Sequence, residues 1–176
     1  MEQYSRSETA VVAILSALLD RGMPVDVAVP GTGQTILHMA CRRMCSPIVS
    51  LLLEYDASVD RSDLKGWAAI HHAAAFARAK VVRILLAAGA SVDIYTFDSS
   101  TPLHLAAASS FDSRDCIALL QNMGAERDSL MTTLDTPLHV FCKMETRDCT
   151  ANGRCLLSFT IFSMNRVRIV SIYNSF

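Results

Sequence analysis

The hexapeptide TPLHLA at Thr101–Ala106 decides the fold, because close copies of it recur along the chain. The copies are TILHMA at Thr35–Ala40, AAIHHA at Ala68–Ala73 and TPLHVF at Thr136–Phe141. The histidines of the four hexapeptides are separated by 33, 33 and 35 residues. A regular period of this length is typical of proteins built from stacked repeats, in which no unit buries its apolar face alone.

A second phrase recurs in register with the hexapeptides. It reads ILLAAGASVD at Ile84–Asp93, and its other copies lie at Ala17–Asp26, Leu51–Asp60 and Leu119–Asp128. Together the two phrases resemble the ankyrin repeat, over roughly residues 7–145. The resemblance implies an all-α solenoid of stacked helix-turn-helix units with projecting β-hairpin loops.

The hexapeptides that begin with Thr-Pro have the features of a helix start. Thr101 is a good N-cap residue, and Pro102 sits at the first helical position, where a missing N–H has no cost. Ala68 replaces this threonine in one unit, and the loss should cost about 1 kcal/mol. Residues placed once per unit lie too far apart to share a metal ion, so we expect the repeated histidines to hydrogen-bond within and between units. His72, outside the series, is expected to be partly exposed.

The predicted array covers residues 7–150 and a non-repeat tail covers 151–176. Within the array we assign a half-unit to 7–30, full units to 31–63, 64–96 and 97–131, and a degenerate unit to 132–150. The half-unit supplies only a second helix, which a capping box at Ser5–Glu8 could start. Two extra residues in the third full unit place Ser109–Asp115 in a turn.

The last unit departs from the family pattern. Phe141 stands where the family has a small alanine, which risks overpacking. Asn152 and Gly153 fall where core leucines belong, so the second helix of this unit should be missing. The tail that follows could cover the end of the stack as extended structure, or be a sequence never selected to fold, as at a truncated or alternative transcript end. A membrane anchor is a weaker alternative, because Arg166 and Arg168 interrupt the apolar run.

Composition excludes several classes of protein. The formal net charge is −1, so the basic surface that nucleic-acid binding requires is absent and no nucleic acid is expected. The six cysteines follow no secretory signal, so we expect reduced thiols in the cytoplasm, with the nucleus as a second possibility. Cys41 and Cys45 could share a metal on a helix, but a structural zinc site needs two more ligands. No metal, cofactor or membrane contact is therefore expected.

The resemblance implies a protein–protein interaction module, a scaffold or adaptor, rather than an enzyme. The sequence has no phosphate loop, nucleophile elbow or paired-carboxylate signature. The alternative is that the chain is an ankyrin fragment or truncated isoform of a larger enzyme, channel or receptor whose chemistry lies outside it. The half-unit start favours the fragment, while the initiator Met and the capping box favour a stand-alone monomer.

The family binds partners along a concave surface made from loop tips and the exposed side of the first helices. Carried over by position, this surface includes an aromatic group in adjacent units and several charged residues. Aromatic residues and arginine are enriched among residues that dominate interface energies. The predicted binding residues are Trp67, Phe76, Tyr95, Phe97, Arg42, Arg43, Lys65 and Asp98.

Overall fold

The computed structural model describes residues 2–43 and 45–152, and within them eight helices and no strand. Side chains are described for residues 9–43 and 45–144. In chain order the helices are α1 (Glu2–Asp20), α2 (Ile36–Arg43), α3 (Ser46–Glu54), α4 (Ala69–Ala75), α5 (Ala79–Ala87), α6 (Pro102–Ala107), α7 (Arg114–Asn122) and α8 (Pro137–Asn152).

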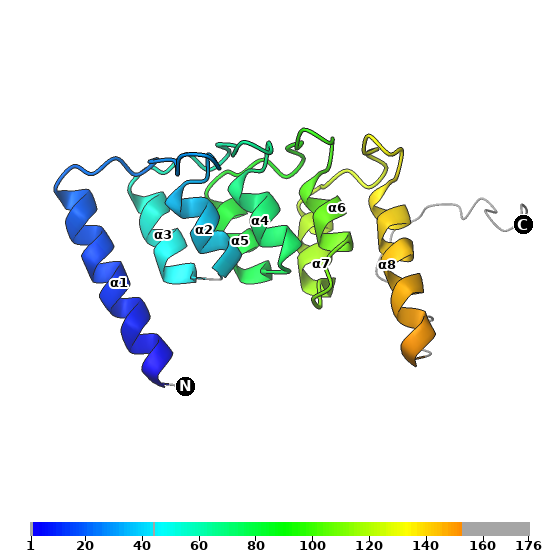
Figure 1. Cartoon of the computed structure of the whole chain (residues 1–176), viewed down its shortest axis with the longest axis horizontal. Helices are drawn as coiled ribbons and strands as arrows, with labels where there is room; N and C mark the ends of the chain where they lie inside the picture. The colour runs from blue at the N-terminus through cyan, green and yellow to red at the C-terminus, as the bar shows by residue number, and fades with distance from the viewer. Residues whose placement is uncertain (1, 44, 153–176) are drawn as a thin grey trace, which may run out of the picture.

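The helices form two rows with the loops along one edge (Figure 1). The inner row is α2, α4, α6 and α8, in which each helix contacts the next. The outer row is α1, α3, α5 and α7, again in consecutive contact. Each inner helix except α8 packs on the outer helix that follows it, so that α2–α3, α4–α5 and α6–α7 are stacked pairs. This arrangement is the all-α solenoid that the repeat predicts.

The inner helices begin as the hexapeptide predicts. The Thr101 hydroxyl accepts a hydrogen bond from the His104 N–H at 3.4 Å, and Pro102 occupies the first turn. Nδ1 of each repeated histidine accepts the backbone N–H of the residue three positions earlier, at 3.0 Å for His38 and His71. Because Ala68 keeps this second bond, α4 starts at the same point without a capping side chain.

The repeated histidines also join one unit to the next. Nε2 of His71 lies 3.1 Å from the carbonyl oxygen of Ile94, and Nε2 of His104 lies 3.1 Å from that of Asp135. Since Nδ1 already accepts a backbone proton, Nε2 carries the hydrogen and donates it. The expectation of hydrogen bonding within and between units is confirmed for these buried side chains.

A continuous apolar core runs between the two rows. The same positions of successive outer helices fill it, as Val49, Val82 and Ile117 do with 0% exposure each. Paired alanines such as Ala73–Ala74, also buried, let the inner helices approach these side chains closely. Stacking therefore buries one apolar surface through all the units.

Backbone turns replace the expected β-hairpins in the described loops. The Asp63 N–H donates to the Trp67 carbonyl at 2.9 Å, and the Thr96 N–H donates to that of Ser100 at 3.0 Å. Neighbouring loops are tied by the aspartates that end the first three copies of the second phrase. Asp60, for example, accepts the Ser91 N–H at 3.1 Å. These hydrogen bonds order the loops along one edge of the array, but the described loops contain no strand.

The two ends of the array depart from the expected details. The helix α1 begins at Glu2, so Ser5 lies inside it and the predicted capping box does not start it. At the other end, α8 continues to Asn152 instead of turning, and no outer helix follows it within the described residues. The tail is described only for residues 151 and 152, the end of α8, so the expectations for it lie almost entirely outside the described residues. None of the described helices is both long and apolar enough to cross a membrane.

Candidate functional site

Trp67 lies at the end of the second loop, the segment that joins α3 to α4, and its indole packs against two histidine rings. Its ring centroid lies 5.1 Å from that of His72 and 6.3 Å from that of His71. The indole is half-buried, so one part is fixed by packing while another part reaches solvent. A rigid, partly exposed aromatic side chain of this kind loses little conformational entropy when it binds a partner.

His72 is buried, not partly exposed as expected, with 6% of its surface accessible. Its Nε2 lies 3.3 Å from Oδ2 of Asp63, and its ring meets that of His38 edge-on at 5.4 Å. Burial, together with the nearby His38, lowers the pKa of His72 to about 4 despite the adjacent carboxylate. The imidazole is therefore neutral at physiological pH and donates one hydrogen bond to Asp63.

Asp63 is a buried carboxylate that organises the second loop. Its Oδ1 accepts the backbone N–H groups of Lys65 at 2.8 Å and Trp67 at 3.0 Å, and Gln34 donates to its Oδ2 at 3.3 Å. Burial raises the pKa of Asp63, but these hydrogen bonds outweigh it and leave the pKa below its ordinary value. The charged side chain thus fixes the loop that presents Lys65 and Trp67. Nothing in the repeat period singles out this aspartate or its pairing with His72.

Phe97 and Tyr95 project from the third loop, the segment that joins α5 to α6. Phe97 is 77% exposed, yet its backbone and ring edge lie against Gly66 of the preceding loop. Tyr95 is 49% exposed and its hydroxyl donates to Oε2 of Glu126 at 3.2 Å. Asp98 is also exposed, but its carboxylate accepts hydrogen bonds from the hydroxyls of Thr96 and Ser100. Asp98 therefore shapes its own loop as well as facing solvent.

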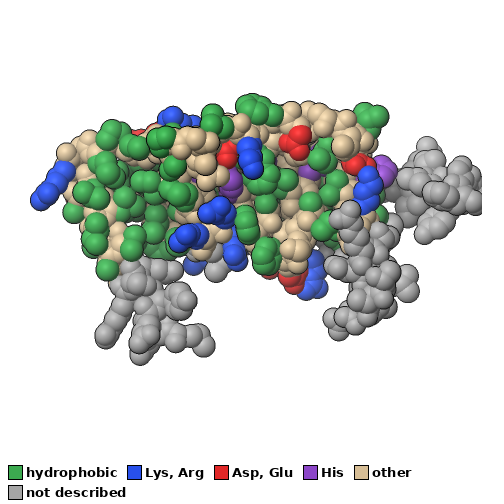
Figure 2. Space-filling model, viewed as in Figure 1, with side chains coloured by type: hydrophobic (Ala, Val, Ile, Leu, Met, Phe, Trp, Pro, Cys, Tyr) green, Lys and Arg blue, Asp and Glu red, His purple; other side chains and the backbone are tan. Residues whose placement is uncertain are grey.

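Arg42, Arg43 and Phe76 lie at the opposite end of the inner helices. The two arginines are exposed in the last turn of α2, and Figure 2 shows basic side chains gathered over this part of the inner row. Phe76 ends α4 and pairs with Phe111 at 6.0 Å, while the guanidinium of Arg78 lies 5.7 Å from the Phe111 ring centroid. Phe111, 51% exposed, was not among the predicted residues.

The predicted binding residues therefore form two groups instead of one. The loop group contains Trp67, Lys65, Tyr95, Phe97 and Asp98, and the turn group contains Arg42, Arg43 and Phe76. Among the described residues no ring contact joins any two of the four predicted aromatic side chains, which lie in adjacent units. The two-residue insertion could have revealed Phe111, because it lengthens the turn that carries this residue. That turn is shorter than expected, since α7 already begins at Arg114.

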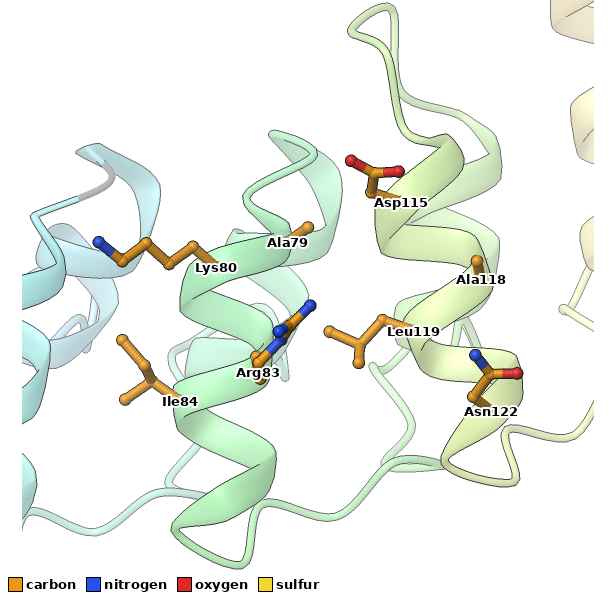
Figure 3. Close-up of a pocket in the computed structure, with 8 residues that line it drawn as sticks. All are labelled: Ala79, Lys80, Arg83, Ile84, Asp115, Ala118, Leu119 and Asn122. Atoms are coloured by element: carbon orange, nitrogen blue, oxygen red, sulfur yellow. The ribbon is translucent and has the colours of Figure 1, made fainter.

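A shallow groove of about 820 Å³ lies on the other side of the molecule, between α5 and α7. Figure 3 shows Arg83 and Leu119 pointing toward one another across it, with Asp115 and Asn122 along the α7 side. The groove holds no histidine, cysteine, serine or threonine, and it has only one carboxylate. It therefore offers no arrangement for nucleophilic or paired acid–base chemistry.

Cys41 and Cys116 are free thiols in the core. Burial raises the pKa of Cys41 and of Cys116 to about 12, which makes both sulfurs unreactive. Cys45 lies beyond the end of α2, at the start of α3, so it does not share a helix face with Cys41 as a metal pair would require. Within the described residues no group of three or more histidine, cysteine or acidic side chains could hold a metal ion.

Comparison with known proteins assigns the repeat. A family model described as ankyrin repeats (3 copies) matches residues 7–96 and 62–129. The mouse B-cell lymphoma 3 protein homolog is 35% identical over 130 residues, which are 72% of this chain and 29% of that protein. Human ankyrin repeat and SOCS box protein 16 is 35% identical over 116 residues, 65% of this chain and 25% of that protein. The Arabidopsis thaliana E3 ubiquitin-protein ligase KEG is 31% identical over 118 residues, 66% of this chain and 7% of that protein. The chain therefore spans less than a third of the length of these relatives.

Proposed function

Because the chain belongs to the ankyrin-repeat family, whose repeats are protein-interaction modules, we propose that it is a scaffold or adaptor that binds a protein partner. The partner would lie along the inner row and its loops, between the loop group at one end of the inner helices and the turn group at the other. The observation that carries the proposal is Phe97, a large apolar side chain that is 77% exposed on a backbone packed against Gly66. Such an anchor is positioned for a partner before binding and serves no buried core.

The chemistry of the two groups defines the partner. Lys65, Arg42 and Arg43 are exposed cations. Trp67 shares the loop of Lys65, and Phe97 lies against Gly66 of that loop. A segment that combines apolar side chains with carboxylates would match both groups. Desolvated aromatic contacts supply affinity, while charges at the edge raise the rate of association and its salt dependence.

The test is capture of partners by the wild-type protein and by variants, followed by titration of each captured partner. Phe97→Ala is expected to weaken binding by about 2 kcal/mol, as for a central aromatic contact. Arg42→Ala combined with Arg43→Ala should mainly slow association and reduce its salt dependence. Met123→Ala is the control, because Met123 is 51% exposed at the end of α7 in the outer row. Equal binding by Phe97→Ala and the wild type would contradict the assignment. Trp67→Ala is a poorer probe, since it also removes packing on His71 and His72.

A second proposal is that the chain is the ankyrin part of a larger protein. The relatives support it, because two of them carry names of an E3 ubiquitin-protein ligase and a SOCS box protein, and the chain matches only 7% and 25% of their length. Sequencing of full-length transcripts tests this proposal. Reads that extend the chain beyond residue 1 or residue 176 into another domain would support it, while reads confined to residues 1–176 in every transcript would contradict it.

We also propose that the protein works in the cytoplasm or nucleus, without a cofactor and without nucleic acid. The free, buried thiols of Cys41 and Cys116 support a reducing compartment, and the net charge of −1 supports a protein partner over a polyanion. Fluorescence imaging of the tagged chain tests the location, and recovery from the secretory pathway would contradict it.

A further inference from the structure

The first helix exposes residues that are buried in the other outer helices. In the register of the second phrase, Leu18 of α1 corresponds to Leu85 of α5 and to Leu120 of α7. Leu85 and Leu120 are 0% exposed, whereas Leu18 is 42% exposed. Ile14 corresponds to Val81, and their exposures are 63% and 0%. The side of α1 that carries Ile14 and Leu18 is uncovered because no inner helix pairs with it within the described residues.

The last helix shows the converse defect. Leu138 of α8 corresponds to Leu37, Ile70 and Leu103 of the other inner helices. Those three are at most 1% exposed, whereas Leu138 is 36% exposed. His139 is exposed too, and its Nδ1 accepts the Thr136 N–H at 3.3 Å as in every other unit. Its Nε2 contacts no loop carbonyl of a following unit within the described residues, unlike Nε2 of His104.

The two terminal helices are complementary halves of one unit. Within residues 2–43 and 45–152, an outer helix without its inner partner stands at one end of the array, and an inner helix without its outer partner stands at the other. Both are longer than their equivalents, with 19 residues in α1 against 9 in α3, and 16 in α8 against 6 in α6. Figure 1 shows that both helices project in the same direction, beyond the edge of the array that lies opposite the loops.

We propose that a second copy of this chain covers α1, with α8 of one copy packing along α1 of the next to complete a composite repeat. The directions of the chain allow this, because α8 runs away from the loop edge and α1 runs toward it, as an inner and an outer helix do within a unit (Figure 1). The matched projections extend the contact beyond the length of an ordinary pair. This inference replaces the monomer expected from the sequence and is independent of the proposed partner surface.

The composite repeat also gives His139 the bond that its equivalents make. His38 Nε2 lies 3.0 Å from the Trp67 carbonyl, and His104 Nε2 lies 3.1 Å from that of Asp135. In the repeat register the residue equivalent to Trp67 in the first loop is Gln34. The Nε2 of His139 in one copy would donate to the Gln34 carbonyl of the next. The contact joins two different surfaces, so it produces open head-to-tail chains and not closed pairs.

Sedimentation of the full chain over a range of concentrations tests the proposal. The mass should rise with concentration in multiples of 19.2 kDa. Ile14→Asp damages only the α1 surface and Leu138→Asp only the α8 surface, so each variant alone should remain at 19.2 kDa. An equimolar mixture of the two retains one intact pair of surfaces, so it should form species of two chains and none larger.

Several results would overturn the proposal. One is a wild-type chain that stays at 19.2 kDa at every concentration. Another is assembly of Leu138→Asp alone, which would show α1 pairing with α1, and a third is a mixture that stays monomeric. Leu64→Asp is the control, because Leu64 is 65% exposed in the loop that joins α3 to α4 and lies on neither α1 nor α8. It should assemble as the wild type does, and its failure would reveal non-specific association. Circular dichroism must show wild-type helix content, and Ile14→Ser and Leu138→Ser replace any variant that loses it.

Discussion

Acidification below about pH 6.5 is expected to destabilise the array steeply, well before its carboxylates are protonated. The cause is the set of buried histidines that join the units. In His71 the Nδ1 accepts the Ala68 N–H at 3.0 Å and Nε2 donates to the Ile94 carbonyl at 3.1 Å. A second proton on this ring, at Nδ1, would point at the backbone N–H of Ala68 and would place a positive charge in the core. Burial accordingly lowers the pKa of His71 to about 4, and burial with His38 nearby lowers that of His72 to about 4.

The sign follows from the protons bound in each state. Between the unfolded pKa of about 6.5 and the folded pKa, the unfolded chain binds a proton at each of these histidines and the folded chain does not. Stability is therefore fully present above that range and falls as the pH drops through it. His71 and His72 should each cost roughly 3 kcal/mol by the lower end of the range. Burial lowers the pKa of His38 and of His104 as well, so these side chains add to the loss.

Urea unfolding at a series of pH values, followed by circular dichroism, measures this effect. His71→Gln should lower stability at neutral pH, because it breaks two hydrogen bonds, and should also flatten the pH dependence by about one proton. His139→Gln is the matched control, since His139 has the same position in its unit but is exposed. The prediction fails if His71→Gln retains the full acid slope of the wild type.

The repeat period predicts the fold well, and physical reasons explain where it stops. Spacing locates each hexapeptide, and Thr101 and Pro102 mark the residue at which a helix starts. Spacing also predicts the bonds of His71 and His104, because one side chain per unit meets the same neighbour each time. It cannot predict His72, whose burial depends on Asp63 of one loop and His38 of the preceding unit.

The candidate site is less predictable because it depends on contacts that differ between units. Positions inherited from the family placed Trp67, Phe76, Tyr95 and Phe97 on one surface. Their packing is set by residues outside the repeat pattern, such as Phe111 beside Phe76. The run of α8 to Asn152 likewise depends on the absence of a turn signal after Phe141, and not on any hexapeptide. The packing of Phe76 and the length of α8 depend on residues that occur in one unit only, so the repeat period does not predict them.

Gly66→Ala is expected to destabilise the array by about 3 kcal/mol, far more than an exposed glycine substitution. Gly66 has a φ of +75°, in the left-handed region that disfavours any side chain. A Cβ there would also lie 2.8 Å from the backbone nitrogen and 2.8 Å from Cδ1 of Phe97. The ring can rotate away, but the backbone nitrogen belongs to the third loop and moves only with it. The substitution should therefore separate the two loops that carry the proposed binding residues.

Gly89→Ala is the control that separates the effect of the close contact with Phe97 from the effect of the left-handed backbone conformation. Gly89 has a φ of +88° but nothing within 4 Å of its added Cβ, so it should lose only about 1 kcal/mol for the left-handed backbone. The difference between the two losses in urea unfolding then measures the approach of the second and third loops. Combining Gly66→Ala with Phe97→Ala should recover only part of the loss, because the ring is removed and the backbone nitrogen stays. Equal losses for Gly66→Ala and Gly89→Ala would show that the loops part freely, and Phe97 would then have no fixed backbone from which to act as an anchor.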